Sequence, residues 1–205
     1  MLNKYFIIIT FIVFGVITAT GQQFHGGVIA GIVGSQVAGD TYSGYNKAGI
    51  FAGGYVSIDV SEKSAFQMEL TYFQKGSREN PTEKNNYQSY LLRLNYIEMP
   101  ILYQYKAGKF TIEAGPSAGF TIGYYEKVNL ETISDKQYYN KPARVTLQIN
   151  VGFSYYISEK IGVGLRTNNS LINVFSSNQT GDVQRLWDKG RYNDALVLSV
   201  FYQFR

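Results

Sequence analysis

The chain has 205 residues, which is enough for one domain with a sizeable core. It contains no cysteine, which excludes disulfides and thiolate metal sites, and its formal net charge of +4 comes without a run of basic residues, so nucleic acid is not an expected partner. Tyrosine (18 residues) and glycine (21) are abundant, whereas there are only 4 prolines. This composition favours many long β-strands.

The first 21 residues have the layout of a secretory signal peptide. Lys4 supplies a positive charge, residues 5–19 form an apolar run, and small residues precede a cleavage position between Gly21 and Gln22. The run is short for a membrane-spanning helix, although a retained anchor is the alternative interpretation. No cysteine follows the run, which excludes lipoprotein processing. We therefore expect a signal peptide at residues 1–21 and one exported domain at residues 22–205.

Residues 110–122 alternate almost without error between apolar and small or polar side chains. Phe110, Ile112 and Phe120 share one face, and Thr111 and Glu113 lie on the other. A period of two indicates a strand, because successive β side chains point to opposite faces. A strand of a dozen residues or more is about twice the usual length in soluble domains. Long strands with one wholly apolar face are typical of a transmembrane β-barrel.

Seven further segments show the same kind of pattern. The expected strands cover residues 23–37, 48–60, 65–75, 89–106, 110–125, 142–156, 161–174 and 191–205. The connections alternate between short turns and four long polar loops, at residues 38–47, 76–88, 126–141 and 175–190. This rhythm predicts an all-β fold, an eight-stranded antiparallel up-and-down transmembrane β-barrel, with short turns at the periplasmic rim and long loops outside.

If the apolar register faces lipid, polar and charged side chains must fill the interior. Buried charges are tolerated only when they pair, so both signs are needed inside. We expect a structural polar network that plugs the lumen, formed by Glu69, Arg93, Glu98, Glu113 and Arg166. The amides expected beside them are Asn95, Gln148, Asn150 and Asn168.

The apolar phase of the fourth strand shifts along its length. Apolar residues occupy even positions up to Tyr96 and odd positions from Met99 onward, with Glu98 and Pro100 at the change. Proline cannot donate to a sheet ladder and is tolerated at bulges, where a strand changes face. The sequence therefore predicts a β-bulge near residues 97–98, formed by Glu98, Met99 and Pro100, with Glu98 turned inward.

No residue set points to catalysis, a cofactor or a metal. His25 is the only histidine and lies near the mature N-terminus, which argues against a Ser–His or Cys–His arrangement. Glu69, Glu98 and Glu113 are candidates for an acid–base site, with the structural network as the favoured alternative. Acidic residues in the loops lack calcium-loop spacing. We expect no catalytic residue, no cofactor and no metal site.

Aromatic residues gather near the expected strand ends, where amphipathic rings would lie at the headgroup level. The predicted girdle consists of Tyr72, Phe73, Tyr103, Tyr105, Tyr124, Tyr125, Tyr155, Tyr156, Tyr202 and Phe204. Trp187 in the fourth loop is expected to anchor that loop at the interface, with a role in partner contact as the alternative.

The strand YLLRLNYIEMPILYQY (residues 90–105) and the glycine-rich strand after it (residues 113–123) resemble the PorT-like outer-membrane β-barrel family of small, porin-like barrels. The resemblance covers nearly the whole mature chain and implies an outer-membrane location in a Gram-negative bacterium. Its motifs are structural, so it implies no activity. The chain departs from the common terminal aromatic residue, because Phe204 is followed by Arg205. One family member is tied to protein secretion, but no residue here carries that role over.

These observations favour a non-enzymatic outer-membrane barrel with a structural or interaction role through its external loops. The expected partners are outer-membrane lipid, the barrel-assembly machinery during biogenesis, and a protein bound by the four loops. One alternative is a narrow pore or an accessory component of a secretion or transport complex. Another is a soluble lipocalin-like ligand carrier, whose apolar face would point inward.

Overall fold

The structure, a computed structural model, describes residues 24–42, 44–129, 131–132, 141–175, 181–186 and 188–204. The expected signal peptide lies outside these residues, as do Trp187 and Arg205. In the described part of the chain, no helix has the length and apolar character needed to cross a membrane.

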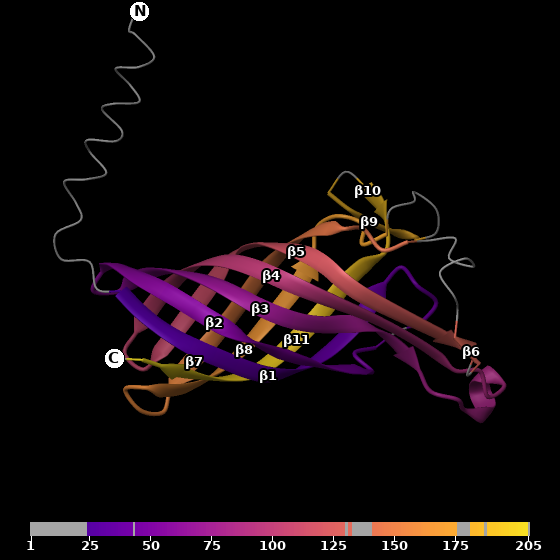
Figure 1. Ribbon diagram of the computed structural model, residues 1–205, viewed down its shortest axis with the longest axis horizontal. Coiled ribbons are helices and arrows are strands. Elements are labelled where there is room, and N and C mark those ends of the chain that lie inside the picture. The colour runs from indigo at the N-terminus through magenta and orange to yellow at the C-terminus, as the bar shows by residue number, and fades with distance from the viewer. Residues whose placement is uncertain are drawn as a thin grey trace, which may run out of the picture.

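Eight long strands close into one antiparallel barrel (Figure 1). They are β1 (Phe24–Ala38), β2 (Lys47–Ser61), β3 (Ser64–Glu79), β4 (Tyr90–Ala107), β5 (Phe110–Val128), β7 (Val145–Tyr156), β8 (Ile161–Ser170) and β11 (Tyr192–Gln203). Strand β1 pairs with both β2 and β11, and β4 pairs with β5, which closes the ring. The predicted eight-stranded antiparallel barrel is confirmed.

Short turns join the strands at the end where β1 begins and β11 ends, and longer connections occupy the other end (Figure 1). Four small elements belong to the long connections: η1 (Glu83–Asn85), β6 (Glu131–Thr132), β9 (Val183–Arg185) and β10 (Asp188–Gly190). Strands β9 and β10 pair with each other, and β6 pairs with the end of β5.

Strands β3, β4 and β5 are 16, 18 and 19 residues long and run past the far ends of β7, β8 and β11 (Figure 1). The expectation that residues 76–79 and 126–128 belong to loops was therefore wrong. Gly76 explains the first error, because it lies inside β3 with φ +141. A Cβ atom there would lie 2.0 Å from the Leu92 carbonyl oxygen, so only glycine allows this close pairing.

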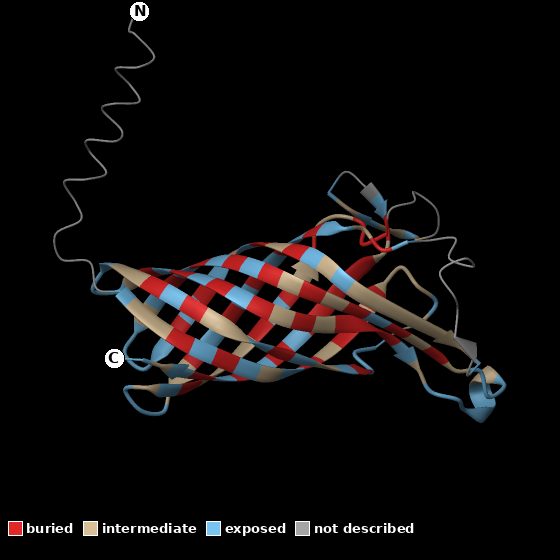
Figure 2. Ribbon diagram, in the orientation of Figure 1, coloured by how far each residue is buried: buried red, intermediate tan, exposed pale blue. Residues whose placement is uncertain are grey.

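Buried and exposed residues alternate along the strands (Figure 2). The exposed face is apolar over most of the barrel, for example at Leu70 (58% exposed), Ile112 (58%) and Leu198 (53%). The buried face points into the lumen and carries most of the polar and charged residues of the strands. This arrangement is the reverse of a lipocalin, and the soluble-carrier alternative was wrong.

The bulge predicted in β4 does not exist at Glu98, Met99 and Pro100. The register between β3 and β4 is uniform on both sides of these residues, and the even positions of β4 face the lumen from Tyr90 to Gln104. The register shift lies between β4 and β5, where Asn95 pairs with Gly123 and Tyr96 with Thr121. The extra residue is therefore on β5.

The apolar phase of β4 shifts because the lumen changes character, not because the strand changes face. At the outer end the interior residues are apolar: Tyr90, Leu92, Leu94 and Tyr96. Further along the same face they include Glu98 and Gln104.

The aromatic residues divide between the two faces of the barrel. Around the short-turn rim, outward-facing rings contact each other in pairs, such as Phe66 with Tyr103 (5.5 Å between ring centroids) and Tyr202 with Phe204 (5.9 Å). Phe73, Tyr124 and Tyr156, which were expected in the girdle, instead pack in the interior. The expected girdle is therefore only partly formed by the predicted residues.

Candidate functional site

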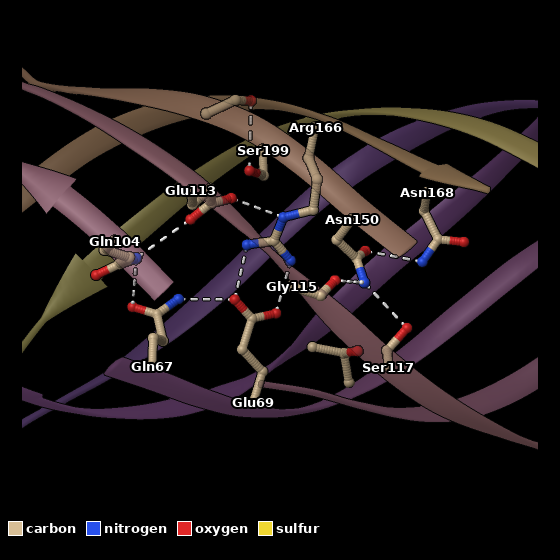
Figure 3. Close-up of polar contacts among 12 residues, drawn as sticks. Gln67, Glu69, Gln104, Glu113, Gly115, Ser117, Asn150, Arg166, Asn168 and Ser199 are labelled. Atoms are coloured by element: carbon tan, nitrogen blue, oxygen red, sulfur yellow. Dashed lines mark hydrogen bonds and ion pairs between the residues drawn. The ribbon is translucent and has the colours of Figure 1, made fainter. Parts of the chain in front are cut away.

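A guanidinium–carboxylate layer crosses the lumen and joins three strands (Figure 3). Arg166 of β8 donates two hydrogen bonds to Glu69 of β3, at 2.8 Å from Nη1 and 2.7 Å from Nη2. Its Nε donates to Glu113 of β5 at 2.7 Å. Gln67 donates to Glu69 at 2.7 Å, and Gln104 donates to Glu113 at 3.2 Å. We call these five residues the arginine layer.

A second ionic group, which we call the lysine layer, consists of Lys75 (β3), Glu98 (β4) and Asn168 (β8). Lys75 and Glu98 form an ion pair, and both side chains are fully buried. Asn168 accepts from Lys75 and donates to Glu98 at 3.0 Å. Lys75 Nζ also lies 4.1 Å from the centroid of the Phe73 ring, a cation–π distance. Asn168 also donates a hydrogen bond to Asn150 at 2.9 Å, which links the lysine layer to further amides (Figure 3).

Apolar side chains fill the lumen at its outer end. Phe51 and Phe73 pack edge to face at 5.1 Å, and Leu92, Leu94 and Tyr96 belong to the same buried cluster. Beside the arginine layer there is a cavity of about 20 Å³, enough for about one water molecule. The interior is thus closed by packed side chains.

Four of the five residues expected in the lumen lie there: Glu69, Glu98, Glu113 and Arg166. The expectation for Arg93 was wrong, because it is exposed on the outer wall. Asn95 shares that outer face and accepts from the Tyr72 hydroxyl at 2.9 Å. Both errors follow from the supposed change of face in β4.

Lys75 is a charged lumen residue that sequence reasoning missed. It was taken as the end of a strand because Gly76 and a charged segment follow it. Strand alternation could have identified Lys75, because it is an odd-numbered residue like Glu69 and the other inward residues of β3.

A second feature, the external mouth, lies at the long-loop end. It is a hollow of about 570 Å³ lined by residues 39–42 of the first connection, Tyr90, Glu126, residues 181–182 and Arg191. Tyr42 stacks on Tyr90 with ring centroids 4.3 Å apart, and the Tyr90 hydroxyl donates to Glu126 at 2.7 Å. The mouth therefore combines an aromatic platform with charges of both signs.

Asp40 lies at the edge of the mouth, outside the membrane-spanning strands. Burial raises the pKa of its carboxyl group. A hydrogen bond from Ser77, the 2.9 Å bond from the Tyr42 amide and the charge of Arg191 oppose this rise. Its second oxygen, Oδ2, is buried without a hydrogen-bond partner in the described part of the chain.

Within the described ranges, no group of three or more histidine, cysteine or acidic side chains is placed to hold a metal ion. His25 lies at the short-turn rim, where its Nε2 is 3.4 Å from Asp59 and its Nδ1 is 3.3 Å from the Gln203 amide nitrogen. Lys106 also contacts Asp59, at 2.6 Å. These contacts join β1, β2, β4 and β11 and give His25 a structural setting.

Comparison with known proteins agrees with this geometry. A family model described as "Outer membrane protein beta-barrel domain" matches residues 20–176. No curated protein matches the chain. Among solved structures, Neisserial surface protein A is 12% identical, with 90% of this chain and 99% of that chain covered and a TM-score of 0.53. Ail of Yersinia pestis, in complex with the heparin analogue sucrose octasulfate, is 9% identical, with 89% and 99% covered and a TM-score of 0.50. At these identities the likeness shows the fold alone.

Proposed function

The chain belongs to the outer membrane protein beta-barrel domain family, and from this premise we propose that it is a closed barrel that binds a partner through its external loops and catalyses no reaction. Its place is the outer membrane. The partner would meet the long-loop end, where the mouth brings together segments that are far apart in the sequence.

The observation that carries this proposal is the contrast between the filled lumen and the open mouth at the long-loop end. The interior is filled by the arginine layer, the lysine layer and an apolar cluster, so it offers no room for a substrate. Above it, the mouth is an outward-facing hollow that combines an aromatic stack with carboxylates. Aromatic rings beside a few polar groups are typical of recognition sites.

The same packing argues against the pore alternative. Ions would have to pass Phe51, Phe73 and Leu94 as well as the buried Lys75–Glu98 ion pair. The role that we propose for both ionic layers is structural: they tie β3 to β4, β5 and β8 across the lumen.

Three narrower points are also proposals. Residues 1–21 act as a cleaved signal peptide, since an exported barrel needs one. The barrel-assembly machinery inserts the mature chain. Kinship with PorT-like barrels is proposed from the motifs of residues 90–105 and 113–123; because these motifs are structural, the kinship concerns the fold and does not by itself assign a part in a secretion complex.

Site-specific photocrosslinking in intact cells tests the loop proposal. A benzoyl-phenylalanine at Thr41 or Tyr87 would lie on the external side, and both positions are exposed. The matched controls are Lys63 and Lys109, which are exposed in the short turns of the opposite rim. We expect a discrete adduct from the loop positions and none from the turns. Adducts from the turns alone would overturn the proposal in favour of a periplasmic partner.

The Ail complex suggests one soluble probe. Because that protein was solved with sucrose octasulfate, a sulfated saccharide belongs in the first set of ligands tested at the mouth. Tyr42→Ala, which removes the stack on Tyr90, should weaken any such binding if the mouth is the site.

A further inference from the structure

Three cations gather on the outer wall of the barrel where β3, β4 and β5 run past the other strands (Figure 1). Arg78 and Arg93 are exposed and Lys127 is half-buried. The register places Leu91 directly between Arg78 and Lys127, and Arg93 two residues further along β4. Because neighbouring strands lie about 4.8 Å apart, Arg78 and Lys127 are separated by only about 10 Å at the backbone. We call these three residues the cationic face.

The carboxylates of the same strands lie on the opposite face. The register and burial patterns of β3, β4 and β5 direct Glu69, Glu79, Glu98, Glu113 and Glu126 to the lumen side. The outward positions of these three strands contain no Asp or Glu. Among the described residues, no ion pair involves Arg78, Arg93 or Lys127. The cationic face therefore has positive charge that the described chain leaves uncompensated.

The height of this face on the barrel matches the outer headgroup level. Tyr103 and Tyr105, each 44% exposed, are the outward-facing aromatic residues of β4 nearest the short turn. Arg93 is ten residues from Tyr103 and twelve from Tyr105. With a rise of about 3.4 Å per residue and a tilt of about 45°, Arg93 differs from them in height by about 24 to 29 Å, close to the roughly 25 Å apolar band of outer-membrane barrels. The side chains between them on this face are Ile97, Met99 and Ile101, with Asn95 next to Arg93.

A hollow of about 840 Å³ opens beside the cationic face. Its lining includes Arg78 and Lys127 together with Leu91, Tyr87 and Asn129. It also includes one carboxylate, Glu79, which accepts a hydrogen bond from Asn85 at 3.0 Å. The hollow thus offers two cations against one carboxylate, with an apolar side chain and an aromatic ring next to the lipid-facing wall. A ligand of mixed character, with anionic and apolar parts, matches this lining.

We propose that the cationic face binds the phosphate groups of an anionic lipid headgroup in the outer leaflet. Arginine suits this role because its guanidinium group can donate two parallel hydrogen bonds to a phosphate. Lys127 adds a point charge, and Leu91 provides apolar contact at the level where the headgroup meets the acyl chains. This site is on the barrel wall and is separate from the mouth, so it does not depend on the proposed loop partner.

The test uses the full mature chain, folded in zwitterionic detergent micelles, with diphosphorylated lipid A as the probe. Apparent Kd is measured by native mass spectrometry across a titration. A basic side chain near an anionic lipid surface contributes roughly a fivefold factor in affinity, so Arg78→Gln/Arg93→Gln/Lys127→Gln should weaken binding by roughly a hundredfold. Arg93→Gln alone should weaken it by roughly fivefold, which keeps the test valid if the triple variant folds poorly.

The matched control is Lys63→Gln/Lys109→Gln/Lys160→Gln, which removes the same charge from the short turns of the opposite rim. Its Kd should stay at the wild-type value, and heat-modifiable gel migration verifies that each variant is folded. Lipid A without phosphates should bind wild type as weakly as the triple variant binds the phosphorylated form. Equal loss in both triple variants would overturn the proposal. Full competition by equimolar inorganic phosphate would also overturn it, since the site would then recognise free phosphate. If the triple variant lost heparin binding but kept the wild-type Kd for lipid A, the face would be assigned to a soluble polyanion instead.

Discussion

The charged side chains inside this barrel stabilise it only when all the partners of a network are present. Arg166 is hydrogen-bonded to both Glu69 and Glu113, whose exposed fractions are 2% and 6%. A buried ion that loses its partner keeps its desolvation cost and gains nothing in return. The contribution of Arg166 therefore depends on the carboxylates that it neutralises.

Arg166→Met should lower the free energy of unfolding by about 3–5 kcal/mol, because it leaves two buried carboxylates without a cation. Urea titration followed by heat-modifiable gel migration measures the change. The triple variant Arg166→Met/Glu69→Gln/Glu113→Gln should regain most of the loss, since no unpaired charge remains. Arg78→Met on the outer wall is the control and should stay within about 0.5 kcal/mol of wild type. An equal loss in the single and triple variants would contradict this account.

Asp40 gives the first external connection a pH dependence. Because burial raises the pKa of Asp40 above its usual 3.8, folding of this segment favours the protonated carboxyl. The resulting stability is fully present below the usual pKa and is lost as pH rises through the raised pKa. Amide hydrogen exchange at residues 39–42, corrected for intrinsic rates, should therefore show more protection in acid than at neutral pH. Asp40→Asn should remove this difference, and protection that grows with pH in the wild type would refute it.

At the scale of elements, the irregularity that matters lies in β5. Its lumen-facing residues are odd-numbered up to Thr121, and beyond the register shift Tyr124, Glu126 and Val128 take the lumen side. Ile122, 57% exposed, is the residue without a counterpart on β4. The shift thus lets the outer end of β5 contribute Tyr124 and Val128 to the apolar cluster.

Deleting Ile122 should leave Tyr124, Glu126 and Val128 on the lumen side, because it removes the residue without a counterpart on β4 and keeps the register on both sides of the shift. The heat-modifiable folded fraction after refolding should therefore stay close to the wild-type value. Deleting Pro100 is the comparison, because β4 keeps a uniform register with β3 around that residue and has no unpaired residue to lose. This deletion should exchange the two faces of one half of β4, and the folded fraction should fall below about half of the wild-type value. A severe defect in the Ile122 deletion with a normal Pro100 deletion would return the bulge to β4.

Strand number and order were predictable because eight amphipathic alternations and four long polar connections are visible in the sequence. The errors at Arg93, Asn95 and the supposed bulge in β4 share one cause, the assumption that the interior is polar throughout. Leu92 and Leu94 face the lumen, although apolar residues were expected to face lipid. The apolar alternation alone therefore predicted Arg93 inside the barrel and a bulge at Glu98. Pairing between Arg166, Glu69 and Glu113 has no local signal, because the contacts join residues 53 and 97 positions apart. Only the closed ring brings them together.

At the scale of the whole molecule, the filling of the lumen decides between a platform and a pore. An ion in the lumen would meet apolar side chains such as Phe51 and Leu94, where dehydration has no compensating ligand. It would also meet the lysine and arginine layers, whose charges are already paired. Both layers contact the apolar cluster, because Lys75 Nζ lies 4.1 Å from the Phe73 ring centroid and the Arg166 guanidinium lies 5.9 Å from that of Phe51. We expect each of these three barriers to block conduction.

Wild-type protein in planar bilayers should therefore give no current steps above the protein-free baseline in concentrated KCl. Leu94→Ala/Phe51→Ala removes bulk from the apolar cluster but leaves both ionic layers, so this variant should also stay closed. Arg166→Met/Lys75→Met/Glu98→Gln on that background disrupts both ionic layers as well, and brief openings are expected only then, because each barrier alone is expected to keep the lumen closed. The control is heat-unfolded protein at the same concentration, which measures leakage caused by protein adsorption alone. Stable unitary conductance in the wild type would overturn the closed-barrel proposal and favour a transport role.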